Sequence, residues 1–299
     1  MNPRGKEGVN TGNILCPICR AETEALGTKR GVRIRRVFHL SRCRSCTFSF
    51  VTDPCTDFAA VYDDDYYIGE GADPMVNYGF EYYHPNETIR RHDWMGIEEF
   101  VSALHPDRGS WLDYGCGNGA LIRSVAERGC WSISGYDNGS WASKARADGL
   151  PVLDEAELAA RRNSFDVITA IEVIEHIADP VGFLTHLRSL ARPGALIFLT
   201  TLNAQVAPRD FPSWSYVRPE IHVSFFTPKA LSRALEKSGF GPCYAGFAPG
   251  WEKMIRFKVM KNMGIKKVAA WQALLPWPVI ARLVDAKYQV TRLPVGIAV

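Results

Sequence analysis

The hydrophobic and polar positions form a regular pattern between residues 110 and 245. Short runs such as "SFDVITAI" and "ALIFLTTL" are apolar at nearly every position, which is typical of parallel strands buried on both faces. Between such runs lie stretches with apolar residues at helical spacing, such as "DPVGFLTHLRSLARPG". In "FTPKALSRALEKSGF", Thr227 holds the favoured position for an N-cap and Pro228 that of the first helical residue. This alternation predicts an α/β fold with a doubly wound parallel sheet.

A further helix is predicted ahead of the sheet, over residues 87–104, where most apolar side chains fall on one face. The residues at this spacing are Ile89, Asp93, Ile97, Phe100, Val101 and Leu104. The stretch before the helix is acidic and rich in tyrosine and phenylalanine, without a clear period. We therefore expect residues 56–105 to form a structured connecting segment and a candidate lid over an acceptor.

A glycine-rich loop, "WLDYGCGNGA", follows the first strand of the predicted sheet. Ligands of doubly wound sheets bind beyond the carboxyl ends of the strands, where the strand order reverses, so we expect this loop at the ligand crevice. Gly115, Gly117 and Ala120 satisfy a dinucleotide-binding pattern. Gly115, Gly117 and Gly119, with Asp113 ahead of them, also satisfy the loop of S-adenosylmethionine (SAM) enzymes. The loop alone leaves both cofactors open.

Acidic residues at the strand ends favour SAM. Asp113 would repel a pyrophosphate, whereas it would attract the ammonium of SAM. Asp137 ends the next strand, about twenty residues on, where a carboxylate can bind the ribose of either cofactor. The run "FDVITAIEVIEHIADP" places Glu172 at a strand end, followed by Glu175 and His176. Such a group is not expected in a hydride-transfer site.

Five segments in the same order and spacing carry a family resemblance: "LDYGCGNG", "GYD", "FDVITAIEVIEHIADP", "RPGALIFLTT" and "HVSFFTPKALSRALEKSGF". The chain resembles the class I SAM-dependent methyltransferases over residues 110–245, especially those grouped with the ubiquinone-biosynthesis O-methyltransferases. The resemblance implies a Rossmann-like, seven-stranded methyltransferase sheet whose last strand runs antiparallel. The residues expected to bind SAM are Asp113, Gly115, Gly117, Gly119, Asp137, Asn138, Asp154 and Glu172.

Two histidines are candidate general bases. Methyl transfer from a sulfonium chiefly requires alignment of the reacting atoms, and a hydroxyl acceptor must also lose its proton. Histidine, with a pKa of about 6.5, is suited to take that proton. His176 and His222 are the candidates, with Glu175 as an orienting partner, and a structural role in a cap or loop is the alternative for each histidine. The candidate walls of an acceptor site, with plain packing as the alternative, are Tyr66, Tyr67, Trp214 and Tyr216.

Four cysteines near the N-terminus fall into two C-x-x-C pairs, Cys16 with Cys19 and Cys43 with Cys46. This spacing predicts a zinc ribbon with a structural Zn²⁺, because all four positions of a tetrahedral ion are filled. The glycine that commonly follows each pair is replaced by Arg20 and Thr47. The expected organisation is a zinc ribbon over 1–55, the connecting segment over 56–105, and a SAM-binding domain with a C-terminal extension over 106–299. An N-terminal ribbon on such a domain is also similar to the zinc-binding methyltransferases of sugar and secondary-metabolite pathways.

Composition narrows the setting but not the substrate. The chain has 46% hydrophobic and 22% charged residues and a net charge of +3, which is ordinary for a globular protein and does not indicate nucleic acid. Its start shows no signal peptide and no stretch matches a membrane span, so a cytoplasmic location is expected. The basic residues between the cysteine pairs and the stretch "WEKMIRFKVMKNMGIKK" fit solvated charge, an anion-binding face or loose contact with an anionic membrane.

The sequence therefore predicts a methyltransferase acting on a small molecule, most simply on a hydroxyl of a metabolite, saccharide or secondary-metabolite intermediate. One alternative is an RNA methyltransferase. Another is a non-catalytic interaction protein that carries a ribbon and a remnant SAM fold. The methylated atom and the oligomeric state leave no recognisable pattern in the sequence.

Overall fold

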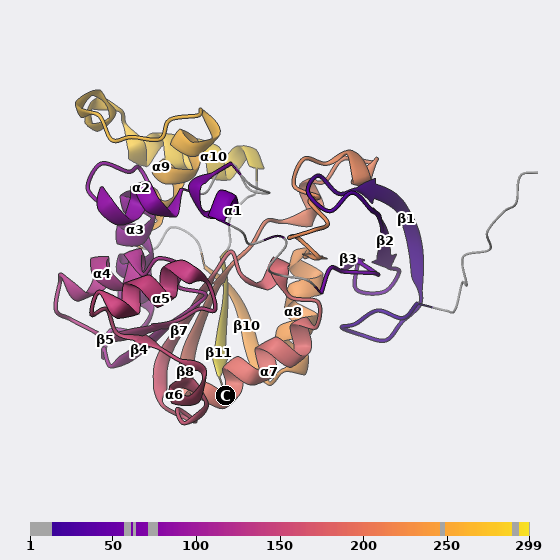
Figure 1. The fold of residues 1–299 in the computed structure, drawn as a ribbon, viewed down its shortest axis with the longest axis horizontal. Helices are drawn as coiled ribbons and strands as arrows, with labels where there is room; N and C mark the ends of the chain where they lie inside the picture. The colour runs from indigo at the N-terminus through magenta and orange to yellow at the C-terminus, as the bar shows by residue number, and fades with distance from the viewer. Residues whose placement is uncertain are drawn as a thin grey trace, which may run out of the picture.

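The computed structural model describes residues 14–56, 61, 64–70, 77–245, 249–288 and 293–298 of the chain. These residues form two β-sheets, a large one surrounded by helices and a small one at the N-terminal side (Figure 1). None of the described helices is long and apolar enough to cross a bilayer.

The large sheet has seven strands in the order β10-β11-β8-β7-β4-β5-β6. Its strands are β4 (Ser110–Tyr114), β5 (Ser132–Tyr136), β6 (Val152–Leu153), β7 (Phe165–Ile171), β8 (Ala191–Thr200), β10 (Phe240–Ala245) and β11 (Leu293–Ala298). The five strands from β8 to β6 run parallel, and β11 is antiparallel to both β8 and β10. The predicted α/β fold class is confirmed, including its reversed strand. The strand order reverses between β4 and β7, so the glycine loop after β4 lies at the switch point.

Helices cover both faces of this sheet. They are α3 (Arg91–Leu104), α4 (Ala120–Ala126), α5 (Ser140–Ala147), α6 (Glu155–Ala159), α7 (Pro180–Leu190), α8 (Pro228–Lys237), α9 (Trp251–Asn262) and α10 (Trp277–Tyr288). Successive strand residues enter opposite cores: Val167 packs with α3, α4 and α9, and Ile168 packs with α7 and α8. Figure 1 shows this two-sided arrangement. It explains why β7 and β8 read as continuous apolar runs.

Helix boundaries follow local signals in most places. The Thr227 hydroxyl accepts the N–H of Ala230 and Pro228 occupies the first turn of α8, as predicted. The helix expected from residue 87 begins only at Arg91, because the preceding residues form turns. There Thr88 pairs with Lys267 in an isolated bridge, so this turn is tied to the C-terminal part of the chain.

The small sheet is antiparallel, in the order β1-β2-β3-β9, and consists of β1 (Thr23–Arg30), β2 (Val37–Cys43), β3 (Ser49–Val51) and β9 (Ser224–Phe225). Strand β9 belongs to the segment between β8 and α8, so the N-terminal sheet is completed by the part of the chain that carries the large sheet. The turn between β1 and β2 is also held by a residue from the segment between β8 and α8. There the buried Glu220 carboxylate accepts the backbone N–H groups of Val32, Arg33 and Ile34.

Short helices α1 (Asp64–Ile68) and α2 (Tyr78–Tyr83) lie on the α3 side of the molecule, together with α9 and α10 (Figure 1). Helix α9 packs along α3, and α10 packs on α9. This arrangement places the connecting segment and the C-terminal extension beside the same end of the large sheet.

Candidate active site

The glycine loop has the backbone that its sequence requires. Gly115, Gly117 and Gly119 all have positive φ values, of 82°, 53° and 73°, a conformation that L side chains rarely adopt. A Cβ at Gly115 would collide with Val173, and one at Gly117 would touch the Tyr78 ring at 3.0 Å. The loop is therefore packed closely against Val173 and Tyr78, and a side chain at Gly115 or Gly117 would displace these neighbours.

Asp137 is fixed against this loop by backbone amides. Its carboxylate accepts the N–H of Gly117 at 3.0 Å and the N–H of Gly139 at 2.6 Å. Burial raises the pKa of this carboxyl, and the two amides counteract the shift. The residue that the sequence assigns to the ribose is thus oriented by the loop that it accompanies.

Asp113 lies near the buried end of β4 and lines a small cavity of about 60 Å³. The Thr169 hydroxyl donates to its carboxylate at 2.8 Å. Burial raises the pKa of Asp113 to about 7, although this hydrogen bond favours the ionised form. A cationic group entering the cavity would stabilise the carboxylate, since an opposite charge nearby favours ionisation.

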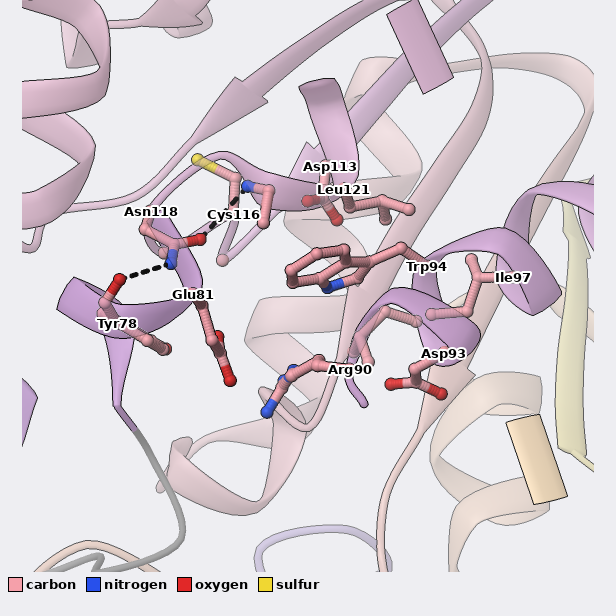
Figure 2. Close-up of a pocket in the computed structure, with 14 residues that line it drawn as sticks. Tyr78, Glu81, Arg90, Asp93, Trp94, Ile97, Asp113, Cys116, Asn118 and Leu121 are labelled. Carbon is pink, nitrogen blue, oxygen red and sulfur yellow. Dashed lines mark hydrogen bonds between the residues drawn. The ribbon is translucent and has the colours of Figure 1, made fainter. Parts of the chain in front are cut away.

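The same cavity contains charged residues that the sequence analysis did not single out (Figure 2). Arg90 precedes α3, Asp93 lies in its first turn, and Glu81 comes from α2. Burial opposes the charge on Arg90, but the carboxylates of Glu81 and Asp93 outweigh it and raise the arginine pKa. A guanidinium in this position can bind a carboxylate. The available signal was Asp93, an acidic residue on the apolar face of a predicted helix.

Aromatic residues complete the cavity. Figure 2 shows the Trp94 ring between Arg90 and the glycine-loop side, where Leu121 and Asp113 lie. Tyr78 lies beside the glycine loop, where Asn118 donates to its carbonyl at 3.0 Å. Sequence reasoning also missed these two aromatic residues, since nothing local distinguishes them from packing residues.

The other predicted cofactor residues occupy different positions. Asn138 accepts a hydrogen bond from the Tyr136 hydroxyl at 2.9 Å. Asp154 caps α6 in a capping box with Glu157, and its half-exposed side chain also pairs with Arg146. Of the predicted cofactor residues, Asp113, Gly115 and Gly117 line the cavity, whereas Gly119, Asp137, Asn138, Asp154 and Glu172 do not.

Glu172 directly follows β7 in a strained conformation, with φ of 55°. Its carboxylate lies 3.6 Å from the Nζ atom of Lys258 on α9, and the two side chains keep 39% and 42% of their surface accessible. Burial raises the pKa of Glu172, but the charges of Lys258 and Lys261 outweigh this and hold it at about 2. The strand end thus presents a permanent negative charge that lysines of the C-terminal extension face.

The candidate catalytic residues do meet in space. His176 and His222 have ring centroids 5.1 Å apart, although they are far apart in the sequence. The Tyr216 hydroxyl donates to Oε1 of Glu175 at 2.8 Å, and its ring stacks on His222. Burial and the charge of Glu172 raise the pKa of Glu175 to about 8. An acid–base cluster thus lies at the carboxyl end of β7.

Hydrogen bonds determine the tautomers of both histidines. Nδ1 of His176 lies 2.9 Å from the carbonyl oxygen of Ile221, and Nδ1 of His222 lies 2.8 Å from that of Tyr216. A carbonyl oxygen only accepts, so each Nδ1 carries the proton. In the neutral ring Nε2 is then the basic nitrogen, which can accept a proton. Ligand atoms of Glu175, His176 and His222 also lie within 4.8 Å of one another, a donor set that a divalent cation can bind.

The predicted aromatic walls pack in two groups. Tyr66 and Tyr67 are buried together with Val61 and Ile221. Trp214 packs on the core of the small sheet, and Tyr216 reaches the catalytic cluster.

The four cysteines of the N-terminal pairs come together as a cluster. The Sγ atoms of Cys16 and Cys46 are 3.6 Å apart, and those of Cys19 and Cys43 are 3.3 Å apart. Four thiolates around one Zn²⁺ at about 2.3 Å would be about 3.8 Å apart. A hydrogen bond from Cys46 lowers the pKa of Cys16 to about 5, and the same contact raises that of Cys46. All four sulfur atoms lie within 4.8 Å of one another, a donor set that suits one tetrahedral cation.

Each pair of cysteines is built as the same knuckle. Arg20 and Thr47, which replace the usual glycines, have φ of 63° and 64°. Their N–H groups donate to the carbonyl oxygens of Cys16 and Cys43, respectively. The N–H of Cys46 also points to Sγ of Cys43, at 3.3 Å. The left-handed residue therefore turns the chain after each pair even without glycine.

Comparisons with known proteins agree with this geometry. The methyltransferase domain family matches residues 87–242, more than half of the chain. A ubiquinone biosynthesis O-methyltransferase of Rhizobium etli is 40% identical over 145 residues, 43% of this chain and 58% of that protein. One from Parvibaculum lavamentivorans is 41% identical over 109 residues, 34% of this chain and 43% of that protein. The chain thus matches about half the length of these relatives.

Among solved structures, the phosphoethanolamine N-methyltransferase 2 of Haemonchus contortus, bound to phosphomonomethylethanolamine and S-adenosylhomocysteine, is similar in fold. Its TM-score is 0.50 at 15% identity, over 82% of this chain and 61% of that one. The family match, the reversed seventh strand and the glycine loop with Asp113 and Asp137 lead to one conclusion: the chain belongs to the methyltransferase domain family.

Proposed function

We propose that this enzyme transfers the methyl group of SAM to a hydroxyl of a small-molecule acceptor, a metabolite, a saccharide or a secondary-metabolite intermediate. The observation that carries the proposal is the pair of basic Nε2 atoms of His176 and His222 beside Glu175, at the end of β7. The O-methyltransferase relatives support the same reaction type.

The residues present fit SAM as the cofactor. Asp113 would face its ammonium, Arg90 its carboxylate and Asp137 its ribose, while Gly115 and Gly117 line the same cavity as Asp113. The bound cofactor supplies an electrophilic methyl group on a sulfonium. We also propose contacts with other parts of the cofactor, or with the acceptor, for Gly119, Asn138, Asp154 and Glu172.

The protein's own chemistry in this proposal is proton removal and alignment. Nε2 of His222 or His176 accepts the proton of the acceptor hydroxyl, while the bonds from each Nδ1 keep the ring oriented. Tyr216 and Glu175 hold the His222 side of the cluster. If Glu175, His176 and His222 hold a divalent cation instead, that cation would bind the same hydroxyl and favour its ionisation.

We also propose a structural Zn²⁺ on Cys16, Cys19, Cys43 and Cys46. It would fix the N-terminal sheet over 1–55, with 56–105 as a connecting lid segment and 106–299 as the catalytic domain. All four positions of the ion would be filled by sulfur, which favours a structural role.

A small molecule is favoured over RNA because several basic residues between the two cysteine pairs contact other residues of the protein. Arg33 pairs with Asp65, Arg36 lies over the Phe38 ring and Arg42 lies over the Phe211 ring. A nucleic-acid interface would instead use such side chains on phosphates.

Calorimetry of SAM and S-adenosylhomocysteine binding to the wild type and to Asp137→Ala tests the first step. Micromolar binding that is lost in the variant supports the cofactor site, and acceptor hydroxyls are then screened, saccharides before RNA. A screen repeated with a chelator separates a histidine base from a bound cation. Methylation of RNA, with affinity that falls steeply with salt, would overturn the small-molecule proposal.

A further inference from the structure

The C-terminal extension presents an unusual number of exposed apolar side chains. Six large ones lie between residues 263 and 283, outside the region matched by the family. They are Met263, Trp271, Leu274, Leu275, Val279 and Leu283. Leu274 is 85% exposed and Leu283 is 65% exposed, values at which most of each side chain faces water. These six residues are called the C-terminal patch below.

The patch is held by an ordered framework. Trp277 is buried against Phe257 and Met260 of α9, and its indole N–H donates to the carbonyl of Gln272 at 2.7 Å. Gln272, itself buried, donates to the carbonyl of Lys267 at 3.0 Å. The apolar side chains outside this framework are therefore displayed by a folded segment. Figure 1 shows the loop that precedes α10 at the upper edge of the molecule, above α9, with α10 beside α9.

The charge of this segment is one-sided. Residues 253–284 contain seven lysine and arginine residues and no acidic residue. Lys253, Lys258 and Lys267 pair with carboxylates of the large-sheet part or of the turn before α3, so the charge available to a partner comes chiefly from the remaining basic residues. Lys266 and Arg282 are exposed and close in sequence to the apolar residues of the patch. Val279 and Leu283 are one turn apart on α10, with Arg282 between them.

We propose that the C-terminal patch docks the enzyme on the surface of an anionic phospholipid bilayer. Apolar side chains with a tryptophan would enter the boundary between headgroups and acyl chains, while lysine and arginine contact the anionic headgroups. No helix in the described part of the chain can span the bilayer, so the contact would be peripheral.

A second copy of the chain is a poorer occupant of this surface. A two-fold contact places the same surface on both subunits, and here it would bring Lys266 and Arg282 of one copy close to those of the other. Lysine is also depleted in protein interfaces. An anionic bilayer complements both the charge and the apolar character.

The patch is connected to the catalytic domain close to the cofactor cavity. Val268 donates its N–H to the carbonyl of Glu87 at 2.7 Å, and Thr88 pairs with Lys267, just ahead of Arg90 and α3. Docking would thus hold the end of the molecule that carries the cavity near the lipid surface.

Flotation of the full chain with vesicles tests this proposal. The probes are vesicles of phosphatidylcholine alone and vesicles of equal parts phosphatidylcholine and phosphatidylglycerol. We expect binding to the second kind only, weakened by salt. Leu274→Ser with Leu283→Ser should reduce the partition coefficient about tenfold or more, and Lys266→Glu with Arg282→Glu by a similar factor.

Matched controls change exposed residues elsewhere: Val32→Ser with Val206→Ser, and Arg162→Glu with Lys237→Glu. All variants should keep the wild-type melting temperature and SAM affinity, which shows that they fold. The proposal is overturned if neither vesicle binds, if both bind equally, or if the controls weaken binding as much. Sedimentation equilibrium measures the oligomeric state of the same variants. If the wild type is a dimer that does not bind vesicles, and Leu274→Ser with Leu283→Ser is a monomer, the patch serves self-association instead.

Discussion

The cysteine cluster and the cavity beside Asp113, which is the proposed cofactor site, both gather titratable side chains in a buried site, but they are built in opposite ways. Each half of the cysteine cluster is one local turn, in which Arg20 or Thr47 reverses the chain and two sulfurs lie within four residues. The cavity instead draws Glu81 from α2, Arg90 from the turn before α3 and Asp113 from β4. Because each half of the cysteine cluster is local, the C-x-x-C spacing in the sequence is enough to predict it. The second exists only after the elements have packed.

The two sites should therefore fail separately, and loss of the cluster has the largest expected effect. In Cys43→Ser the proposed zinc content should fall from one ion to nearly none per chain, and the melting temperature should fall by about 10 °C or more. SAM affinity should stay within about threefold, because the cavity shares no residue with the cluster. Metal analysis, calorimetry and thermal unfolding measure the three quantities.

Cys130→Ser is the control for this variant, since Cys130 is exposed and outside the cluster. Unchanged zinc and stability in Cys43→Ser would show that the four sulfurs do not hold an ion.

The catalytic cluster is tested by His222→Asn, because the asparagine amide can replace Nδ1–H toward the Tyr216 carbonyl but has no basic nitrogen. We expect kcat for the hydroxyl acceptor to fall by about 10²–10³ while SAM affinity is unchanged. His176→Asn distinguishes the two candidates. If His222→Asn keeps the wild-type kcat while His222→Phe has a reduced kcat, His222 only supports the loop.

Substitution of Arg90 tests whether a residue that reaches the cavity only through tertiary packing binds the cofactor. Arg90→Met should weaken SAM binding by about 100-fold, because a charge-assisted bond is lost and Glu81 and Asp93 lose their partner. Arg90→Lys should restore part of the affinity. Zinc content should not change in either variant. Calorimetry showing wild-type affinity in Arg90→Met would place the cofactor carboxylate elsewhere.

The pH dependence of SAM binding is the finest test of the cavity. The pKa of Asp113 is raised to about 7, so affinity should increase about fivefold between about pH 6 and about pH 7.4 as the carboxylate ionises, and should level off above that as the SAM ammonium, with a pKa of about 7.8, loses its proton. Asp113→Asn should bind weakly at every pH. A pH-independent affinity in the wild type would contradict the contact with the ammonium.

The same carboxyl affects stability in the opposite direction. Its folded pKa lies above the unfolded value, so stability is fully present below the unfolded pKa and is lost as the pH rises through about 7. Asp113→Asn should therefore raise the melting temperature of the cofactor-free protein at about pH 8 but not at about pH 4. An equal shift at both pH values would assign the effect to packing.

Most of the fold was accessible from the sequence because its signals are periodic. The apolar runs of β7 and β8 and the Thr227–Pro228 start of α8 depend on neighbours only a few residues away. The helix expected from residue 87 was wrong in its first turn. Lys267, far along the chain, pairs there with Thr88, and periodicity carries no information on such a contact.

The site was accessible in part for the same reason. The glycine loop, Asp113 and Asp137 follow successive strands, so chain order alone places them at one edge of the sheet. Arg90 and Trp94 line the cavity together with Asp113, but no fixed sequence distance relates them to the glycine loop. The proximity of His176 and His222 likewise required the segment between β8 and α8 to fold back over β7.

By itself, then, the sequence determined the α/β alternation, the left-handed glycines, the two knuckles and the carboxylates at the strand ends. Each of these is set by backbone geometry over a few residues. Only the tertiary structure decided that β9 completes the N-terminal sheet, that Glu220 holds the turn at residues 32–34, and that Arg90 enters the cofactor cavity. These contacts join residues far apart in the sequence, and they form because packing and buried charge must be satisfied wherever the chain brings the partners together.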